Sequence, residues 1–136
     1  MEEEIFKADF CSLFWNEKLQ YVREEWRVVN CSFEEFKSMN LYLQEFCIKK
    51  NIKSLIIDTF DAISILPNSH HEWLETEFND NFLKRTGIEN IITILPESLV
   101  TSISVNKFYD NIKQTSQNTR ILKMKTLDEV YKYLNI

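Results

Sequence analysis

Short runs of apolar and β-branched residues alternate along this chain with longer segments that have helical periodicity. The runs are SLIID at 54–58, NIITIL at 90–95 and TRILKM at 119–124. The first two are almost wholly apolar, which is typical of central parallel strands with both faces covered. The third alternates apolar and basic residues, which indicates a strand at the edge of a sheet. Strands that alternate with helices favour an α/β fold with parallel strands.

Three helix starts share the capping-box pattern, in which a hydroxyl residue precedes a glutamate by three positions. The hydroxyl accepts a hydrogen bond from the N–H of the third helical residue, and the glutamate accepts one from the N–H of the capping residue. Apolar residues follow each start at spacings of three and four, which predicts one buried stripe per helix. The pairs are Ser32 with Glu35, Ser69 with Glu72, and Thr126 with Glu129.

The chain has 1 glycine, Gly87, and its position bears on both structure and function. Gly87 follows the helix that starts at Ser69, so we expect it in the left-handed conformation that ends many helices. Loops that wrap backbone around phosphates need glycine. The sequence therefore argues against a P-loop and a dinucleotide-binding glycine turn. A further helix is predicted with apolar positions from Val105 to Ile112 and Ser104 as its cap.

A β-hairpin is predicted before the first helix. The segments FCSLFW at 10–15 and LQYVREEWRVV at 19–29 flank the polar turn NEK. The expected fold is α/β, a single domain over 1–136 with a mixed sheet, an N-terminal hairpin and then strand–helix repeats. The expected element order is β-β-α-β-α-β-α-β-α.

Charge argues against two classes of partner. The net charge is −5, and no basic run stands out. Nucleic acid and anionic membrane surfaces would repel such a chain, so neither is an expected partner. No apolar run approaches the roughly 20 residues of a membrane-spanning helix, so no membrane insertion is expected.

The cysteines indicate a reducing compartment. The chain has 3 cysteines, an odd number without CxxC spacing, which predicts free thiols. The start, MEEEIFKADF, is acidic, unlike the basic beginning of a signal peptide. The expected location is the cytoplasm.

The pattern resembles the STAS-like family of small bacterial domains, related in fold to anti-sigma-factor antagonists. The resemblance spans nearly the whole chain and is carried by the hairpin ending in EEWRVVNCSFEEF, the strand SLIID, the helix HHEWLETEFNDNFLKRTGI, ENIITILPESL and KTLDEVYKYL. It implies a compact regulatory or signalling α/β domain without a cofactor that binds a protein partner. Relatives are switched by phosphorylation of a serine in an aspartate–serine–serine (or threonine)–glycine turn. The matching segment here, DTFDAISILPNSHHEW, lacks that turn, and Ser69 is its phosphosite candidate.

Five residues around this segment are candidates for contact with a ligand or partner. Asp58 ends the strand SLIID, at the sheet edge where α/β proteins place ligands, and Asp61 follows it. Ser69, His70 and Trp73 lie at the start of the next helix. No metal site is expected. A histidine and a glutamate four residues later share one helix face, but a zinc site needs at least three protein ligands.

Three functional hypotheses remain open. The first is a non-enzymatic STAS-like regulatory domain that binds a protein partner or a small ligand. The second is a small hydrolase-like enzyme that uses Asp58 with His70 or His71, although no GxSxG turn is present. The third is a structural self-associating domain, with a homodimer as its simplest form. Phe14 and Trp15 beside the hairpin turn are candidates for a partner or dimer contact.

Overall fold

A computed structural model describes residues 1–97, 103, 106 and 119–134, without the side chains of 78–80. The described chain is one mixed α/β domain built on a six-stranded sheet. In chain order the elements are β1 (Glu3–Lys7), β2 (Cys11–Asn16), β3 (Tyr21–Trp26), α1 (Phe33–Lys49), β4 (Ser54–Asp58), α2 (Asn68–Thr76), the π-helix η1 (Glu77–Phe82), α3 (Leu83–Arg85), β5 (Asn90–Ile94), β6 (Arg120–Met124) and α5 (Leu127–Tyr133).

The strands follow one another across the sheet in chain order, from β1 to β6. The pairs β1–β2 and β2–β3 are antiparallel, and the pairs from β3 to β6 are parallel. The predicted hairpin is therefore confirmed as β2 and β3, and TRILKM is confirmed as an edge strand, β6. Of the predicted helix at 104–112, all but residue 106 lies outside the described residues.

The first strand, β1, was not predicted from the sequence. It forms the other edge of the sheet and has a register shift between Glu4 and Phe6. Its charged residues conceal the apolar alternation that would have indicated a strand. Charged side chains and irregular pairing are also means by which proteins protect an exposed sheet edge. The Tyr42 hydroxyl, from α1, donates a hydrogen bond to the Ile5 carbonyl at 3.0 Å and so covers part of this edge.

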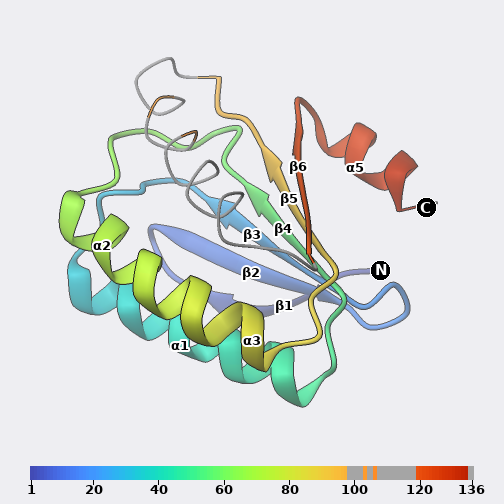
Figure 1. Ribbon diagram of the computed structural model, residues 1–136. Coiled ribbons are helices and arrows are strands. Elements are labelled where there is room, and N and C mark those ends of the chain that lie inside the picture. Colours follow the sequence, from blue (N-terminus) through green and yellow to red (C-terminus); the bar gives the residue numbers. More distant parts are fainter. Residues whose placement is uncertain (98–102, 104–105, 107–118, 135–136) are drawn as a thin grey trace.

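The two faces of the sheet are covered by different helices (Figure 1). On one face, α1 and α2 pack over a large core that includes Leu13, Leu55 and Ile91. On the other face, Val130 of α5 packs on a smaller cluster that includes Ile56. Successive residues of β4 thus enter opposite cores, which confirms that SLIID is buried on both sides.

Two of the three predicted caps are present. The Ser32 hydroxyl accepts from the Glu35 N–H at 3.1 Å, and the Glu35 carboxylate accepts from the Ser32 N–H at 3.2 Å. The Thr126 hydroxyl accepts from the Glu129 N–H at 3.2 Å, but the Glu129 carboxylate accepts from the Lys125 N–H, so only half of that predicted box forms. The sequence therefore located the starts of α1 and α5 correctly.

The predicted cap at Ser69 is wrong. Helix α2 begins at Asn68, with Pro67 as a cap that makes no side-chain hydrogen bond. Proline fixes φ near the helical value and suits the residue at a helix start, so the first turn forms before Ser69. Ser69 lies inside that turn, and its hydroxyl is directed to the neighbouring His70 ring.

The expected left-handed conformation of Gly87 is also wrong, because Gly87 has no positive φ. The helix instead ends at Thr86, which is extended at φ −105° and ψ 160°. The left-handed position appears after α1, where Asn51 has φ 54°. Asparagine tolerates this conformation because its short polar side chain can hydrogen-bond locally.

One carboxyl group lies inside the larger core. Glu24, on β3, is 4% exposed, and its Oε1 accepts a hydrogen bond from the Trp26 indole N–H at 2.8 Å. Burial raises the pKa of Glu24 to about 7, although the Trp26 hydrogen bond acts to lower it. Side chains of neighbouring strand residues alternate between faces, so Glu24 is directed toward α1, on the side of Val22 and Trp26.

Candidate functional site

The β4–α2 loop, residues 59–67, leaves the carboxyl end of β4 and is held on two sides by backbone hydrogen bonds. The Thr59 N–H donates to the Ile94 carbonyl at 3.2 Å, and the Thr59 hydroxyl donates to the same oxygen at 2.6 Å. On the other side, the Ile63 N–H donates to the Arg27 carbonyl at 3.1 Å, and the Val29 N–H donates to the Ile63 carbonyl at 3.3 Å. The loop therefore has a defined backbone conformation.

Three large apolar side chains of this loop face solvent. Phe60 is 42% exposed, Ile63 59% and Ile65 57%. Ala62, between them, is buried and anchors the loop in the larger core. Single exposed apolar residues are common on protein surfaces, but three within six positions of a fixed loop form a local apolar surface.

Asp58 ends β4, as predicted, and shapes this loop. Its Oδ1 accepts a hydrogen bond from the Phe60 N–H at 3.1 Å, and its Oδ2 lies 3.4 Å from Nη1 of Arg23. Burial raises the pKa of Asp58, whereas the Phe60 N–H and the charge of Arg23 act to lower it. Asp61, the second predicted aspartate, lies in the same loop and is exposed.

The partner of Asp58, Arg23, is the centre of an ionic cluster on the sheet. The guanidinium forms ion pairs with Glu2 at 2.9 Å and with Glu25 at 2.8 Å, and it lies 4.5 Å from the centre of the Phe14 ring. Burial acts to raise the pKa of Glu2, but hydrogen bonds from Arg23 and Tyr21 outweigh it, so the pKa of Glu2 is lowered. Arg23 is thereby occupied by three carboxylates, which favours a structural role.

Ser69 and His70 form a second local arrangement. The Ser69 Oγ lies 3.0 Å from Nδ1 of His70, and Nε2 of His70 lies 2.7 Å from the Cys31 carbonyl. Because a carbonyl only accepts hydrogen bonds, Nε2 carries a proton, and in the neutral imidazole Nδ1 then accepts the hydrogen bond from Ser69. Ser69 is exposed, whereas the imidazole of His70 is buried against the rings of Phe33 and Phe36.

The predicted site residues thus divide into two groups. Asp58 is hydrogen-bonded to Phe60 and paired with Arg23, whereas His70 lies with Ser69 and Cys31. Trp73 belongs with His70, because its ring is 6.2 Å from that of Phe36. His71 is buried as well, at 5% exposure.

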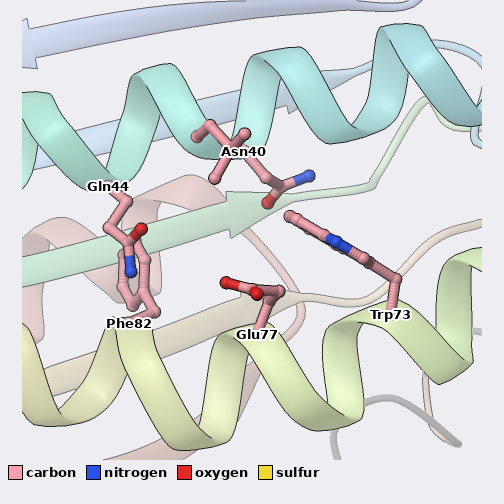
Figure 2. A pocket seen from close by; sticks show the side chains of 6 residues that line it. Asn40, Gln44, Trp73, Glu77 and Phe82 are labelled. Atoms are coloured by element: carbon pink, nitrogen blue, oxygen red, sulfur yellow. The ribbon is translucent and has the colours of Figure 1, made fainter.

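A groove that the sequence did not reveal lies between α1 and the helix formed by α2 and η1 (Figure 2). The groove is open to solvent on one side, and its volume is about 10 Å³, the room that one water-sized group needs. Asn40, Gln44 and Leu41 line it from α1, and Trp73, Glu77 and Phe82 line it from the opposite helix. The available signal was the i, i+4 pair Asn40 and Gln44, polar residues on the buried stripe of α1.

The rings beside the hairpin turn have partners within the chain. Trp15 packs edge-on against Phe46 at 5.3 Å, and Nζ of Lys50 lies 5.1 Å from the centre of the Trp15 ring. Phe14 lies under Arg23. All three cysteines, of which Cys11 and Cys47 are buried, are free, as predicted.

Comparisons of the chain with protein-family models, with curated proteins and with solved structures gave no match. In the described part of the chain, no helix is both long enough and apolar enough to cross a membrane. The same residues contain no group of three or more histidine, cysteine, aspartate or glutamate side chains arranged to hold a metal ion.

Proposed function

We propose that this chain is a non-enzymatic regulatory domain that binds a protein partner through the β4–α2 loop. The observation that carries the proposal is the exposure of Phe60, Ile63 and Ile65 on a loop whose backbone is already fixed. A surface that is ordered before binding loses little conformational entropy on association. Exposed apolar side chains then supply the favourable free energy.

A protein partner suits this surface better than a small ligand. Small-molecule sites enclose roughly 300–1,000 Å³ and bury most of the ligand. The three side chains instead project from the surface, as residues that enter a pocket on another protein do. The groove between α1 and η1 is far smaller than a small-molecule site, at about 10 Å³.

Charge favours a different protein over a second copy of this chain. Asp61 lies exposed among the apolar side chains, and the chain has a net charge of −5. Two copies would bring like charges to the same contact, which opposes self-association. The partner that fits best has an apolar pocket with a basic rim.

The STAS-like resemblance, a cytoplasmic location and the absence of nucleic-acid binding belong to the same proposal. The succession of strands from β3 to β6, the free cysteines and the acidic net charge support these assignments. Phosphorylation of Ser69 would place its charge near the β4–α2 loop, and the exposure of Ser69 would give a kinase access.

Site-specific photo-crosslinking tests this proposal. We would introduce a photoreactive phenylalanine analogue at Ile63 in cells that make the protein, with the same substitution at Ile48 as a control. Ile48 is also exposed and apolar, at 39%, but lies on α1. We expect one discrete adduct from position 63 and none of the same mass from position 48. An adduct that contains only this chain would support the self-associating alternative, and no adduct would refute the proposal.

A second candidate, acyl transfer, has one specific observation in its favour, the contact between Ser69 and His70. In this reaction the Ser69 Oγ would form a bond to an acyl carbon, and its proton would pass to Nδ1 of His70. His70 would then donate that proton to the departing alkoxide. The Cys31 carbonyl would orient the ring. Asp58, the partner expected from the sequence, has no hydrogen bond to His70 in the described chain.

Labelling with a fluorophosphonate probe tests this candidate. Covalent attachment at Ser69, abolished in His70→Gln while the fold is retained, would support it. Labelling of Ser69 at the same rate as in unfolded protein would eliminate it.

A further inference from the structure

The groove between α1 and η1 is a second surface, separate from the β4–α2 loop, and Asn40, Gln44 and Glu77 line it with amide and carboxylate groups. Gln44 is 5% exposed and lines the groove, yet its side chain has no hydrogen bond among the described residues. Its amide atoms are not sealed from solvent, so in the free protein they contact water, which a ligand with matching hydrogen bonds can replace.

The hydrogen bonds of the neighbouring residues determine which atoms remain available. Asn40 donates one N–H of Nδ2 to the Phe36 carbonyl at 2.9 Å, which leaves its second N–H and its oxygen. Glu77 accepts from the Asn81 amide through Oε2 at 2.8 Å, and its Oε1 remains. Figure 2 shows the Asn40 oxygen and the Glu77 carboxylate directed into the space between the helices. The groove therefore offers acceptors from two sides, and Gln44 can add a third.

The charge and shape of the groove limit the chemical class of the ligand. The carboxylate of Glu77 disfavours anions, and the indole ring of Trp73 forms a wall that suits a cation. The groove volume of about 10 Å³ admits one group the size of a water molecule. An ammonium group has this size, carries a positive charge and donates three hydrogen bonds.

The backbone at the groove has an unusual conformation as well. Residues Glu77–Phe82 form a π-helix, and both end residues line the groove. Wider helical turns of this kind are rare and occur often at functional sites. Figure 2 shows the side chains of Glu77 and Phe82 projecting from this helix toward α1, with Phe82 on the side of Gln44 and Glu77 on the side of Trp73.

We infer that this groove binds a primary ammonium group, which accepts no hydrogen bond and donates to Asn40, Gln44 and Glu77. The alkyl chain of the ligand would leave along the open side, past Leu41, which is 39% exposed. A free alkylamine and the side chain of a lysine both present this group. This site does not depend on the β4–α2 loop.

Nuclear magnetic resonance titration tests the inference, with the Trp73 indole N–H and the Gln44 side-chain amide as reporters. The ligands are n-butylammonium chloride and, at the same ionic strength, n-butanol as a neutral control of equal length. We expect saturable shifts of both reporters with n-butylammonium only. Equal shifts with n-butanol, or none with either, would overturn the inference and leave the groove as a site for an ordered water molecule.

A matched pair of variants tests the role of charge. Glu77→Gln can still accept from Asn81, and we expect it to weaken n-butylammonium binding by about tenfold or more, the effect of removing one charge-assisted hydrogen bond. Glu72→Gln, on an exposed position of the same helix, should leave binding unchanged. Equal affinities of the two variants would contradict the proposed site. The ligand comparison in the unmodified protein stands if Glu77→Gln fails to fold.

Two further ligands separate the sources of the amine. If Nα-acetyl-lysine amide binds as well as n-butylammonium, the site is open to lysine side chains. Binding of n-butylammonium alone indicates a site for small amines. Nα,Nε-diacetyl-lysine amide lacks the charge and should not bind; if it binds equally well, an ammonium site is refuted.

Discussion

The buried carboxyl of Glu24 makes a quantitative prediction about pH and stability. In the folded chain its pKa is about 7, against an ordinary value of 4.5, because burial disfavours the charged form. The unfolded chain therefore loses this proton at lower pH than the folded chain does. The contribution of Glu24 to stability is fully present below pH 4.5, is lost progressively as pH rises toward 7, and stays lost above it.

The substitution Glu24→Gln removes this titration and keeps the acceptor for the Trp26 indole N–H. One pKa unit corresponds to about 1.4 kcal/mol, so the shift of Glu24 corresponds to about 3 kcal/mol. We expect the stability difference between variant and unmodified protein to favour the variant by about that much more at pH 8 than at pH 4. The cost of burying the extra amide is independent of pH and cancels from this comparison.

Urea unfolding followed by tryptophan fluorescence at the two pH values measures this difference. The substitution Glu17→Gln, at an exposed position of the hairpin turn, is the control and should change stability by less than about 0.5 kcal/mol at either pH. A stability difference for Glu24→Gln that is the same at pH 4 and pH 8 would refute the reasoning. It would mean that Glu24 ionises inside the core as readily as in water.

Two other predictions concern helix caps and thiols. Ser32→Ala should lower the free energy of unfolding by about 1 kcal/mol, because Ser32 caps α1, whereas Ser69→Ala should cost less than about 0.5 kcal/mol, because Ser69 caps nothing; equal losses in urea unfolding would show that the capping assignment is wrong. A thiol reagent should modify Cys31 first, since it alone is partly exposed, while the two core thiols should react only as the chain unfolds. Burial raises the pKa of Cys31 to about 11, so even this reaction should be slow at neutral pH and accelerate as pH rises; faster modification of a core thiol in the folded protein would contradict this order.

The sequence predicted the interior of the fold better than its edges. The strands SLIID and NIITIL were recognised because both of their faces are buried, which leaves an unbroken apolar run. The edge strand β1 was missed because one edge faces solvent and three of its five residues are charged. Its pairing with β2 depends on tertiary contact, which local pattern does not record.

Errors at the helix ends have a similar physical origin. Ser32 and Ser69 carry the same capping-box spacing, but Pro67 precedes only Ser69 and moves the helix start to Asn68. Gly87 was expected to adopt the left-handed conformation after its helix, and it does not. Asn51, which follows a different helix, adopts that conformation. Local patterns indicate which conformations a residue tolerates, and competition among neighbours decides which one is adopted.

The candidate site was predicted in part. The sequence pointed to the segment after β4, and the exposed loop lies there, but the exposure of Phe60, Ile63 and Ile65 depends on how the chain folds over Ala62. The groove at Gln44 was missed because polar residues in an apolar stripe are recognised only once the facing helix is placed. Adjacent Ser69 and His70 were considered, but the contact between them required the corrected helix start.

The affinity of the crosslinked partner for two variants tests the account most directly. The first variant replaces Phe60, Ile63 and Ile65 by serine, and the second replaces only Ile48, on α1. Truncation of residues that dominate an interface weakens binding strongly, so we predict a loss of about a hundredfold or more for the first variant and no measurable loss for the second. If the partner binds the triple-serine variant with unchanged affinity, the β4–α2 loop is not its binding surface.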